Sequence, residues 1–140
     1  MSTNPTRKDY LPFGKPNFTQ EEIDAVTRVM QSGWIGMGNE VALFEKEIAG
    51  FLNVPHVVCV DSCTSALFLS SKAQGIGEGD EVIVPSLTFC SSANAAIYCG
   101  AKPVFCDIDE NTLCTTAELI LKKVSLKQKQ LFWFIMEDIQ

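Results

Sequence analysis

The stretch HVVCVDSCTSALFLSSKAQGIGEGDEVIV, residues 56–84, decides the fold class. It opens with a short β-branched run at 56–60, continues with helical character over 62–74, turns at GIGEGD and closes with a second apolar run at 81–84. Short apolar strands that alternate with helices are typical of βαβ units, in which helices cover a parallel sheet. A third run, VFCDI at 104–108, extends the pattern. The sequence therefore predicts an α/β fold with a partial parallel-type sheet and flanking helices.

Two more helices are predicted before this stretch. Thr19 and Glu22 fit a capping box, and Ser32-Gly33 ends the helix that they begin. The glycine-rich run WIGMG at 34–38 predicts a loop. Asn39 is expected to cap the second helix, whose apolar stripe is Val41, Phe44, Ile48 and Phe51.

The pattern also continues after residue 84. Residues 88–99 predict a helix, and Gly100 stands where a C-terminal cap belongs. Thr115 or Thr116 is expected to cap a last helix that runs to Leu121.

Composition excludes several classes of protein. The 140 residues include 17 acidic and 11 basic side chains, a net charge of -6, which argues against binding to nucleic acid. No apolar run approaches the roughly 20 residues that span a bilayer. The polar N-terminus has no signal-peptide core. The six cysteines form no C-x-x-C pair and His56 is the sole histidine, so we expect no metal site and read the cysteines as buried, reduced side chains of a cytoplasmic protein.

The loop at 61–66, DSCTSA, is a candidate phosphate site. It follows the first predicted strand and opens a helix, so unpaired backbone N–H groups and the positive end of the helix dipole meet there. Its small hydroxyl and thiol side chains leave room for a ligand. An ordinary helix cap is the alternative, because Ser and Thr are favoured at caps in any case.

A second loop, PSLTF at 85–89, follows the next strand. In open α/β sheets, ligands bind at the carboxyl ends of the strands, so Phe89 is expected near the first loop. An aromatic ring there can stack on a flat heterocycle. The alternative is that Phe89 belongs to the core.

Four segments, in order, carry a resemblance to a known family: SGWIGMGNEVALFEKEIAGFL, VDSCTSAL, GIGEGDEVIVPSLTFCSSANA and GAKPVFCDID. The chain resembles the DegT/DnrJ/StrS family of sugar aminotransferases from about Phe13 to about Leu121. The resemblance implies the N-terminal part of the large domain of fold type I, which binds pyridoxal 5'-phosphate (PLP).

The resemblance assigns the phosphate turn to Ser62, Cys63, Thr64 and Ser65. Residues 62–66, SCTSA, match the S-G-T-A-A turn of the family, in which the amides of Thr64 and Ser65 would hold the cofactor phosphate. Cys63 and Ser65 depart from the usual Gly and Ala.

Other residues follow from the same resemblance. Phe89 matches the aromatic residue that stacks on the pyridine ring. Trp34 and Gly38 lie in a segment that shapes the substrate site, often across a dimer interface. Asp107 and Asp109 match a strand-end D-I-D that we interpret as structural.

The implied reaction moves an amino group from glutamate to a nucleotide-linked keto sugar, in a homodimer of the intact protein. The Schiff-base lysine and the acid that pairs with the cofactor nitrogen match no residue here, so no catalytic residue is assigned among Lys102, Lys122 and Lys123. The resemblance thus implies a truncated enzyme that is inactive alone. A fragment of a PLP-dependent sugar dehydratase and a stand-alone α/β module that binds a phosphorylated ligand are the alternatives.

We divide the chain into an arm at 1–18, a partial large domain at 19–124 and a tail at 125–140. The tail, SLKQKQLFWFIMEDIQ, does not resemble the family. With suitable codons, a shifted reading frame from Ser125 gives TETKAIILVHYGGYP, a family-like strand, so a frameshift near 123–125 is our hypothesis. A C-terminal strand, or an edge that binds a partner protein, is the alternative. We expect a marginally stable fragment with exposed apolar surface.

Overall fold

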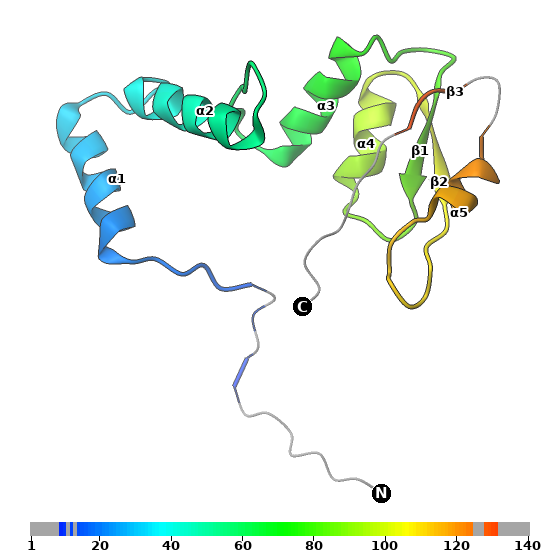
Figure 1. Ribbon diagram of the computed structural model, residues 1–140, viewed down its shortest axis with the longest axis horizontal. Helices are drawn as coiled ribbons and strands as arrows, with labels where there is room; N and C mark the ends of the chain where they lie inside the picture. The colour runs from blue at the N-terminus through cyan, green and yellow to red at the C-terminus, as the bar shows by residue number, and fades with distance from the viewer. Residues whose placement is uncertain (1–8, 11, 13, 125–127, 132–140) are drawn as a thin grey trace, which may run out of the picture. The chain divides into compact units, whose positions relative to one another are not determined.

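The computed structural model describes residues 9, 10, 12, 14–124 and 128–131. The chain divides into two compact units, Met1–Cys59 and Val60–Gln140, which we describe separately. Figure 1 labels the helices and strands of both units. The described residues of the predicted arm at 1–18 form no helix or strand.

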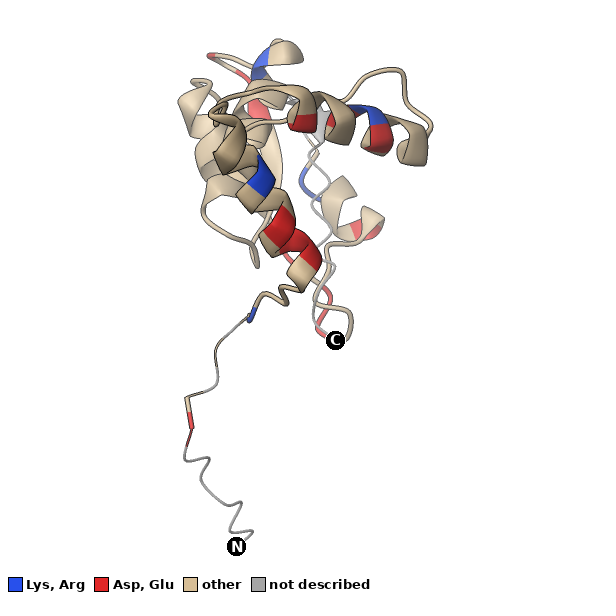
Figure 2. Cartoon of the chain, turned by 90° about the vertical axis from the view of Figure 1, so that its left-hand side faces the viewer, with Lys and Arg blue, Asp and Glu red and all other residues tan. Residues whose placement is uncertain are grey.

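The first unit contains helix α1, Gln20–Ser32, whose predicted capping box is confirmed. The side chain of Thr19 accepts a hydrogen bond from the first turn, while Glu22 accepts one from the Thr19 backbone at 2.6 Å. Glu21 and Glu22 lie in that turn, where negative charge suits the helix dipole (Figure 2). The helix ends at Gly33, whose φ of 72° is the left-handed cap that glycine adopts without strain.

Helix α2, Asn39–Leu52, follows the loop and corrects one prediction. Its N-cap is Gly38, in extended conformation, and Asn39 is already helical. The expected cap at Asn39 is therefore wrong by one position, and no side chain caps α2. No residue of α1 or α2 is buried.

The second unit contains a parallel sheet of three strands in the order β2-β1-β3: β1 is Glu81–Pro85, β2 is Lys102–Cys106 and β3 is Gln128–Leu131. The predicted parallel pairing is confirmed. The second of these strands begins two residues before its predicted start, because Lys102 lies opposite Glu81 and its N–H donates to the carbonyl oxygen of Asp80 at 2.9 Å. Pro103, which has no N–H to donate, fits an edge strand.

Helices cover both faces of this sheet (Figure 1). They are α3 (Cys63–Ala73), α4 (Ser91–Tyr98) and α5 (Ala117–Leu121), each within two or three residues of its predicted bounds. Val82 and Val84 point to one face and pack with Ala96 of α4, while Ile83 points to the other and packs with Ile120 of α5. The period-2 alternation places β1 in the centre of an α/β/α arrangement.

The predicted strand at 56–60 is wrong. These residues have no strand conformation, and the side chain of Val58 is 76% exposed. A strand needs neighbouring backbone to complete its hydrogen bonds, and within the described residues no strand pairs with this segment. The apolar pattern is typical of a buried strand, but periodicity does not show whether another strand lies beside it to complete its hydrogen bonds.

The expectations for the cysteines and for the C-terminal tail are confirmed or tested only in part. All six cysteines are free, but only Cys99 and Cys106 are buried, whereas Cys63 and Cys90 are exposed at the starts of helices. Of the predicted tail, residues 128–131 form β3, and residues 125–127 and 132–140 lie outside the described residues. Among the helices described, none has the length and apolar character to cross a bilayer.

Candidate functional site

The loop at 61–66 forms the N-terminal turn of α3. Ser62 is the N-cap, and its Oγ accepts a hydrogen bond from the N–H of Ser65 at 3.2 Å. The same hydroxyl lies 3.0 Å from Oγ of Ser65. The N–H of Ala66 donates to the carbonyl oxygen of Ser62 at 3.0 Å. The predicted cap is thus present, and the loop is ordered by its own hydroxyl groups.

The backbone N–H groups of Cys63 and Thr64 have no hydrogen-bond partner among the described residues. They lie in the first turn of α3, where the helix dipole adds positive potential. Cys63 is exposed and does not adopt positive φ, so the turn does not need the glycine that is usual at this position. This turn can therefore accept an anion through amides that are open to it.

Asp61 helps to order the turn. Hydrogen bonds from the hydroxyls of Ser65 and Ser62 hold the pKa of the Asp61 carboxyl below its ordinary value of 3.8. Asp61 is therefore ionised at neutral pH, and the two hydroxyls are held near the start of the helix.

Phe89 lies at the entry to α4, and its side chain is 71% exposed. Burial in the core, the alternative for this residue, does not occur. Its helix packs against α3, where Phe68 and Tyr98 meet edge to face with ring centroids 6.4 Å apart. The phosphate turn and Phe89 therefore precede two helices that pack side by side in the same unit (Figure 1).

Trp34 and Gly38 come together in the first unit. The indole Nε1–H donates to the carbonyl oxygen of Met37 at 2.8 Å, which folds the loop over its own ring. A Cβ at Gly38 would lie 2.8 Å from Cδ1 and Nε1 of Trp34, so only glycine fits beneath the ring. This contact explains why residue 38 is a glycine.

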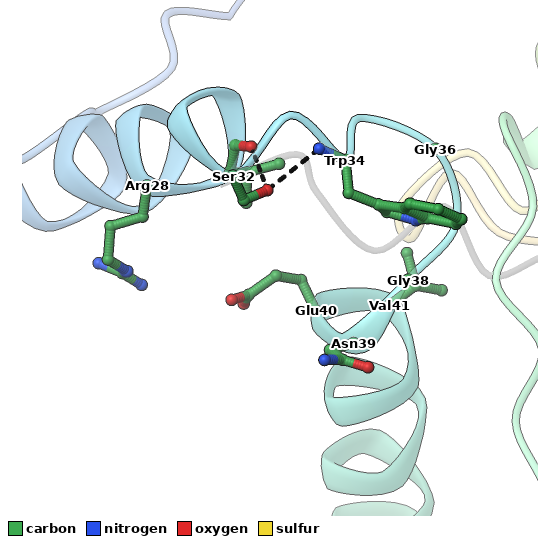
Figure 3. A pocket seen from close by; sticks show the side chains of 9 residues that line it. Arg28, Ser32, Trp34, Gly36, Gly38, Asn39, Glu40 and Val41 are labelled. Atoms are coloured by element: carbon green, nitrogen blue, oxygen red, sulfur yellow. Dashed lines mark hydrogen bonds between the residues drawn. The ribbon is translucent and has the colours of Figure 1, made fainter.

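The loop of Trp34 borders a pocket of about 420 Å³ (Figure 3). Arg28 of α1 and Glu40 of α2 contribute the charged side chains of its lining, and Asn39 contributes an amide. Sequence reasoning missed these three. Their one signal was proximity along the chain to the predicted loop at 34–38.

Asp109 closes a turn after β2. Its Oδ1 accepts hydrogen bonds from the N–H groups of Asn111 and Thr112, at 3.0 Å and 2.9 Å. These bonds, that of Thr112 foremost, lower the pKa of Asp109 below its ordinary value of 3.8. The Oδ1 of Asp107 accepts from the N–H of Ile108 at 2.9 Å. These local contacts order the turn after β2, and the structural interpretation of the pair stays a prediction.

The described lysines include two in ion pairs. Nζ of Lys102 lies 3.2 Å from Oε1 of Glu81, on the neighbouring strand. Nζ of Lys122 lies 3.0 Å from Oε1 of Glu118, one helical turn away. Both contacts are local, and neither lysine is placed at the turn of α3.

The sequence matches the DegT/DnrJ/EryC1/StrS aminotransferase family over residues 16–136. That range covers most of the chain and includes most of the predicted tail at 125–140, whose origin in a frameshift stays a prediction. A curated relative, the spore coat polysaccharide biosynthesis protein SpsC of Bacillus subtilis, is 55% identical over 107 residues. Those residues are 76% of this chain and 28% of SpsC.

Solved structures agree. The aminotransferase TlmJ from Streptoalloteichus hindustanus is 42% identical with a TM-score of 0.78, over 83% of this chain and 32% of TlmJ. The sugar aminotransferase Spr1654 from Streptococcus pneumoniae in its PLP form, which is described as putative, is 34% identical with a TM-score of 0.79, over 86% of this chain and 31% of Spr1654. The same protein is also known in a PMP form.

The chain spans about a third or less of the length of these relatives. Its parallel sheet and flanking helices are those of the N-terminal part of PLP-dependent aminotransferases, which confirms the predicted fold class. The open amides at the start of α3 and the exposed Phe89 lie on that fold. The chain belongs to the DegT/DnrJ/EryC1/StrS aminotransferase family.

Proposed function

We propose that this chain forms the cofactor-phosphate part of a PLP-dependent sugar aminotransferase. The intact enzyme would act in the cytoplasm as a homodimer and move an amino group from glutamate to a keto group of a nucleotide-linked sugar. The observation that carries the proposal is the turn at the start of α3, with the N–H groups of Cys63 and Thr64 open to an anion.

The residues of the turn suit the phosphate of PLP. The open amides of Cys63 and Thr64 would hold it, and the dipole of α3 would add favourable potential. The Ser65 amide, which the resemblance also assigns to the phosphate, would have to leave its bond to Ser62 Oγ to join them. When bound, PLP supplies the electron sink that amino transfer needs. The exposed ring of Phe89 would lie against the flat face of the cofactor and keep water from it.

Trp34 and Gly38 would form part of the substrate site. Trp34 presents a large exposed aromatic surface that is fixed by its hydrogen bond to Met37. A fixed aromatic ring can contact a sugar or a base with little loss of conformational freedom. The six free cysteines fit a reducing compartment.

The 140-residue chain by itself should bind PLP without covalent attachment and without turnover. Lys102 and Lys122 are engaged in local ion pairs, and no lysine of this sequence stands in a motif that matches the cofactor lysine of the family. Mass spectrometry after borohydride reduction checks this expectation, because a reduced lysine adduct would add the mass of the cofactor less one oxygen atom: water leaves as the C=N bond forms, and reduction adds two hydrogens.

The binding test compares PLP, pyridoxal and inorganic phosphate by fluorescence or calorimetric titration of the chain. Ser65→Asp places a negative charge in the turn and should weaken PLP binding about tenfold, since the new carboxylate would repel the phosphate at close range. Ser70→Asp, on the exposed side of the same helix, is the matched control and should have no effect.

Phe89→Ala separates the cofactor from a simple phosphate ligand. It should weaken PLP binding but leave the binding of inorganic phosphate unchanged, because phosphate has no ring to stack. Equal losses for both ligands would favour a module that binds any phosphorylated ligand. If the unmodified chain binds neither PLP nor phosphate, the proposed role of the turn is wrong for this chain.

A further inference from the structure

One side-chain hydrogen bond in the first unit differs from the others given by the structure. The backbone N–H of Cys59 donates to Oε1 of Glu45 at 2.8 Å, across fourteen positions of sequence. Among the described residues of this unit, the other side-chain hydrogen bonds join residues two to four apart. Glu45 is thus the side chain that ties helix α2 to the segment at 56–60.

In this contact the Glu45 carboxylate accepts the hydrogen bond that a neighbouring strand would accept in a sheet. Glu45 and Cys59 are both half-buried, so an unpaired N–H would lose its water without compensation. No strand accepts from this segment within the described residues, and the carboxylate supplies the acceptor instead. A hydrogen bond to an ionised carboxylate is about twice as strong as one between neutral groups.

Cys59 lies close in sequence to the candidate phosphate turn. Three residues after it the chain reaches Ser62, the cap of α3 and the first residue of the candidate phosphate turn. Because the backbone is continuous, fixing it at Cys59 removes conformations that the turn would otherwise sample.

We propose that Glu45 is a positioning residue for the phosphate turn. Its carboxylate holds the backbone of Cys59 and thereby restricts the chain that enters α3. The ordering of the turn is a property of this chain alone, while its consequence for PLP binding rests on the proposed function.

The experiment measures amide hydrogen exchange of the full chain by NMR at Cys59, Ser65 and Ala66. Glu45→Ala should speed exchange at Cys59 by about tenfold or more, the loss expected for a charge-assisted bond. Exchange at Ser65 and Ala66, whose N–H groups close the turn on Ser62, should rise with it. Glu45→Gln keeps an acceptor oxygen and should restore most of the protection.

Glu47→Ala is the matched control, because Glu47 is exposed on the same helix and makes no side-chain contact given by the structure. It should leave all three amides unchanged. Glu45→Asp, whose carboxylate is one methylene shorter, should also speed exchange at Cys59, and it tests the contact even if Glu45→Ala unfolds.

The outcomes are distinct. Faster exchange at Cys59, Ser65 and Ala66 in Glu45→Ala but not in Glu47→Ala supports the proposal, and a parallel loss of PLP affinity extends it to function. If Ser65 and Ala66 are unaffected, or if Glu47→Ala has the same effect, the proposal is overturned. If the turn loosens as expected but the unmodified chain binds no PLP, the positioning role stands and the proposed function fails.

Discussion

Gly38 is a residue whose identity is fixed by a single neighbour. Because the Trp34 ring lies 2.8 Å from the place of a Cβ, Gly38→Ala must displace the indole and break its bond to Met37. We expect the indole N–H signal of Trp34 to shift in NMR and its exchange to speed up by roughly three- to tenfold, the effect of losing a neutral hydrogen bond.

Gly36→Ala is the control for that change. Gly36 lies in the same loop, has no positive φ, and a Cβ there would meet no atom within 4 Å. The indole signal should stay in place. The measurement is best made in a Trp133→Phe background, which leaves one tryptophan in the chain. Equal shifts in the two glycine variants would contradict the packing explanation.

Asp109 should make the loop after β2 sensitive to acid. Its pKa is lowered in the folded chain, so the ionised carboxylate favours the folded loop. This contribution is present above the ordinary pKa of 3.8 and is lost as the pH falls through the lowered value. Asp109→Ala should therefore speed amide exchange at Asn111 and Thr112 at pH 6 and make less difference near pH 3. Glu110→Gln, at an exposed neighbour, should give no such difference.

Residue chemistry was predictable where a single local rule decides it. Thr19 and Ser62 cap their helices, and Gly33 ends α1, because each bond involved lies within a few residues. The prediction for Asn39 was wrong because the first backbone bond of α2 runs from the N–H of Ala42 to the carbonyl oxygen of Gly38, so Asn39 already lies inside the helix. A side chain that can cap does not by itself fix the residue at which a helix begins.

At the scale of elements, α1 depends on its cap to an unusual degree. None of its residues is buried, so tertiary packing within the described residues adds little to its stability. Thr19→Ala removes the capping box and should destabilise the helix by about 0.5–2 kcal/mol. Circular dichroism should record a loss of helix at 222 nm, and exchange should be faster in the first turn.

Thr27→Ala tests whether the loss of helix in Thr19→Ala is caused by removal of the capping box. The Thr27 hydroxyl donates to the carbonyl oxygen of Ile23 within the same exposed helix, and alanine has the higher helix propensity. Helix content should be equal or higher. A loss as large as that of Thr19→Ala would mean that the capping box is not what holds α1.

Strand β1 is the element on which the second unit depends. Ile83 is 2% exposed and joins the cluster with Cys106 and Ile120, while its neighbours Val82 and Val84 serve the opposite face. Ile83→Ala should lower the free energy of local opening of β1 by about 2–5 kcal/mol, measured by amide hydrogen exchange. Val58→Ala, at a largely exposed side chain, should lower the same free energy by well under 1 kcal/mol.

The contrast between β1 and the segment at 56–60 marks the limit of prediction for elements. Both are apolar β-branched runs, and the sequence predicted a strand for each. EVIV became a central strand because 102–106 and 128–131 lie beside it and complete its hydrogen bonds. HVVCV has no such neighbour among the described residues, and its Cys59 N–H binds a side chain instead. An apolar pattern indicates that a segment favours burial, but whether it pairs with another strand depends on the rest of the chain.

At the scale of the whole molecule, the candidate site residues fall into two groups, one in each unit. Ser62, Thr64 and Ser65 share one unit with Phe89, whereas Trp34 and Gly38 belong to the other. The sequence could predict each group, since each is a short motif at a helix end. The functional tests above therefore address each group by its own variants.

Exposed apolar surface is the last property that belongs to the whole chain. Ile35 and Phe51 are 81% and 85% exposed, and the solved relatives match over about a third of their length. Apolar surface of this kind promotes dye binding and self-association. We expect strong fluorescence of an apolar dye and a sedimentation coefficient that rises with protein concentration.

A paired substitution can test whether these two residues are responsible. Ile35→Ser with Phe51→Ser should lower dye fluorescence and self-association at unchanged helix content, because neither side chain is buried. The control is Gln31→Ser with Lys46→Ser, at exposed polar positions of α1 and α2. It should change neither dye fluorescence nor self-association. An unmodified chain that stays monomeric, binds no dye and unfolds cooperatively would contradict the expectation. The apolar side chains of the first unit would then be covered in solution, because exposed apolar surface of this extent would otherwise bind the dye.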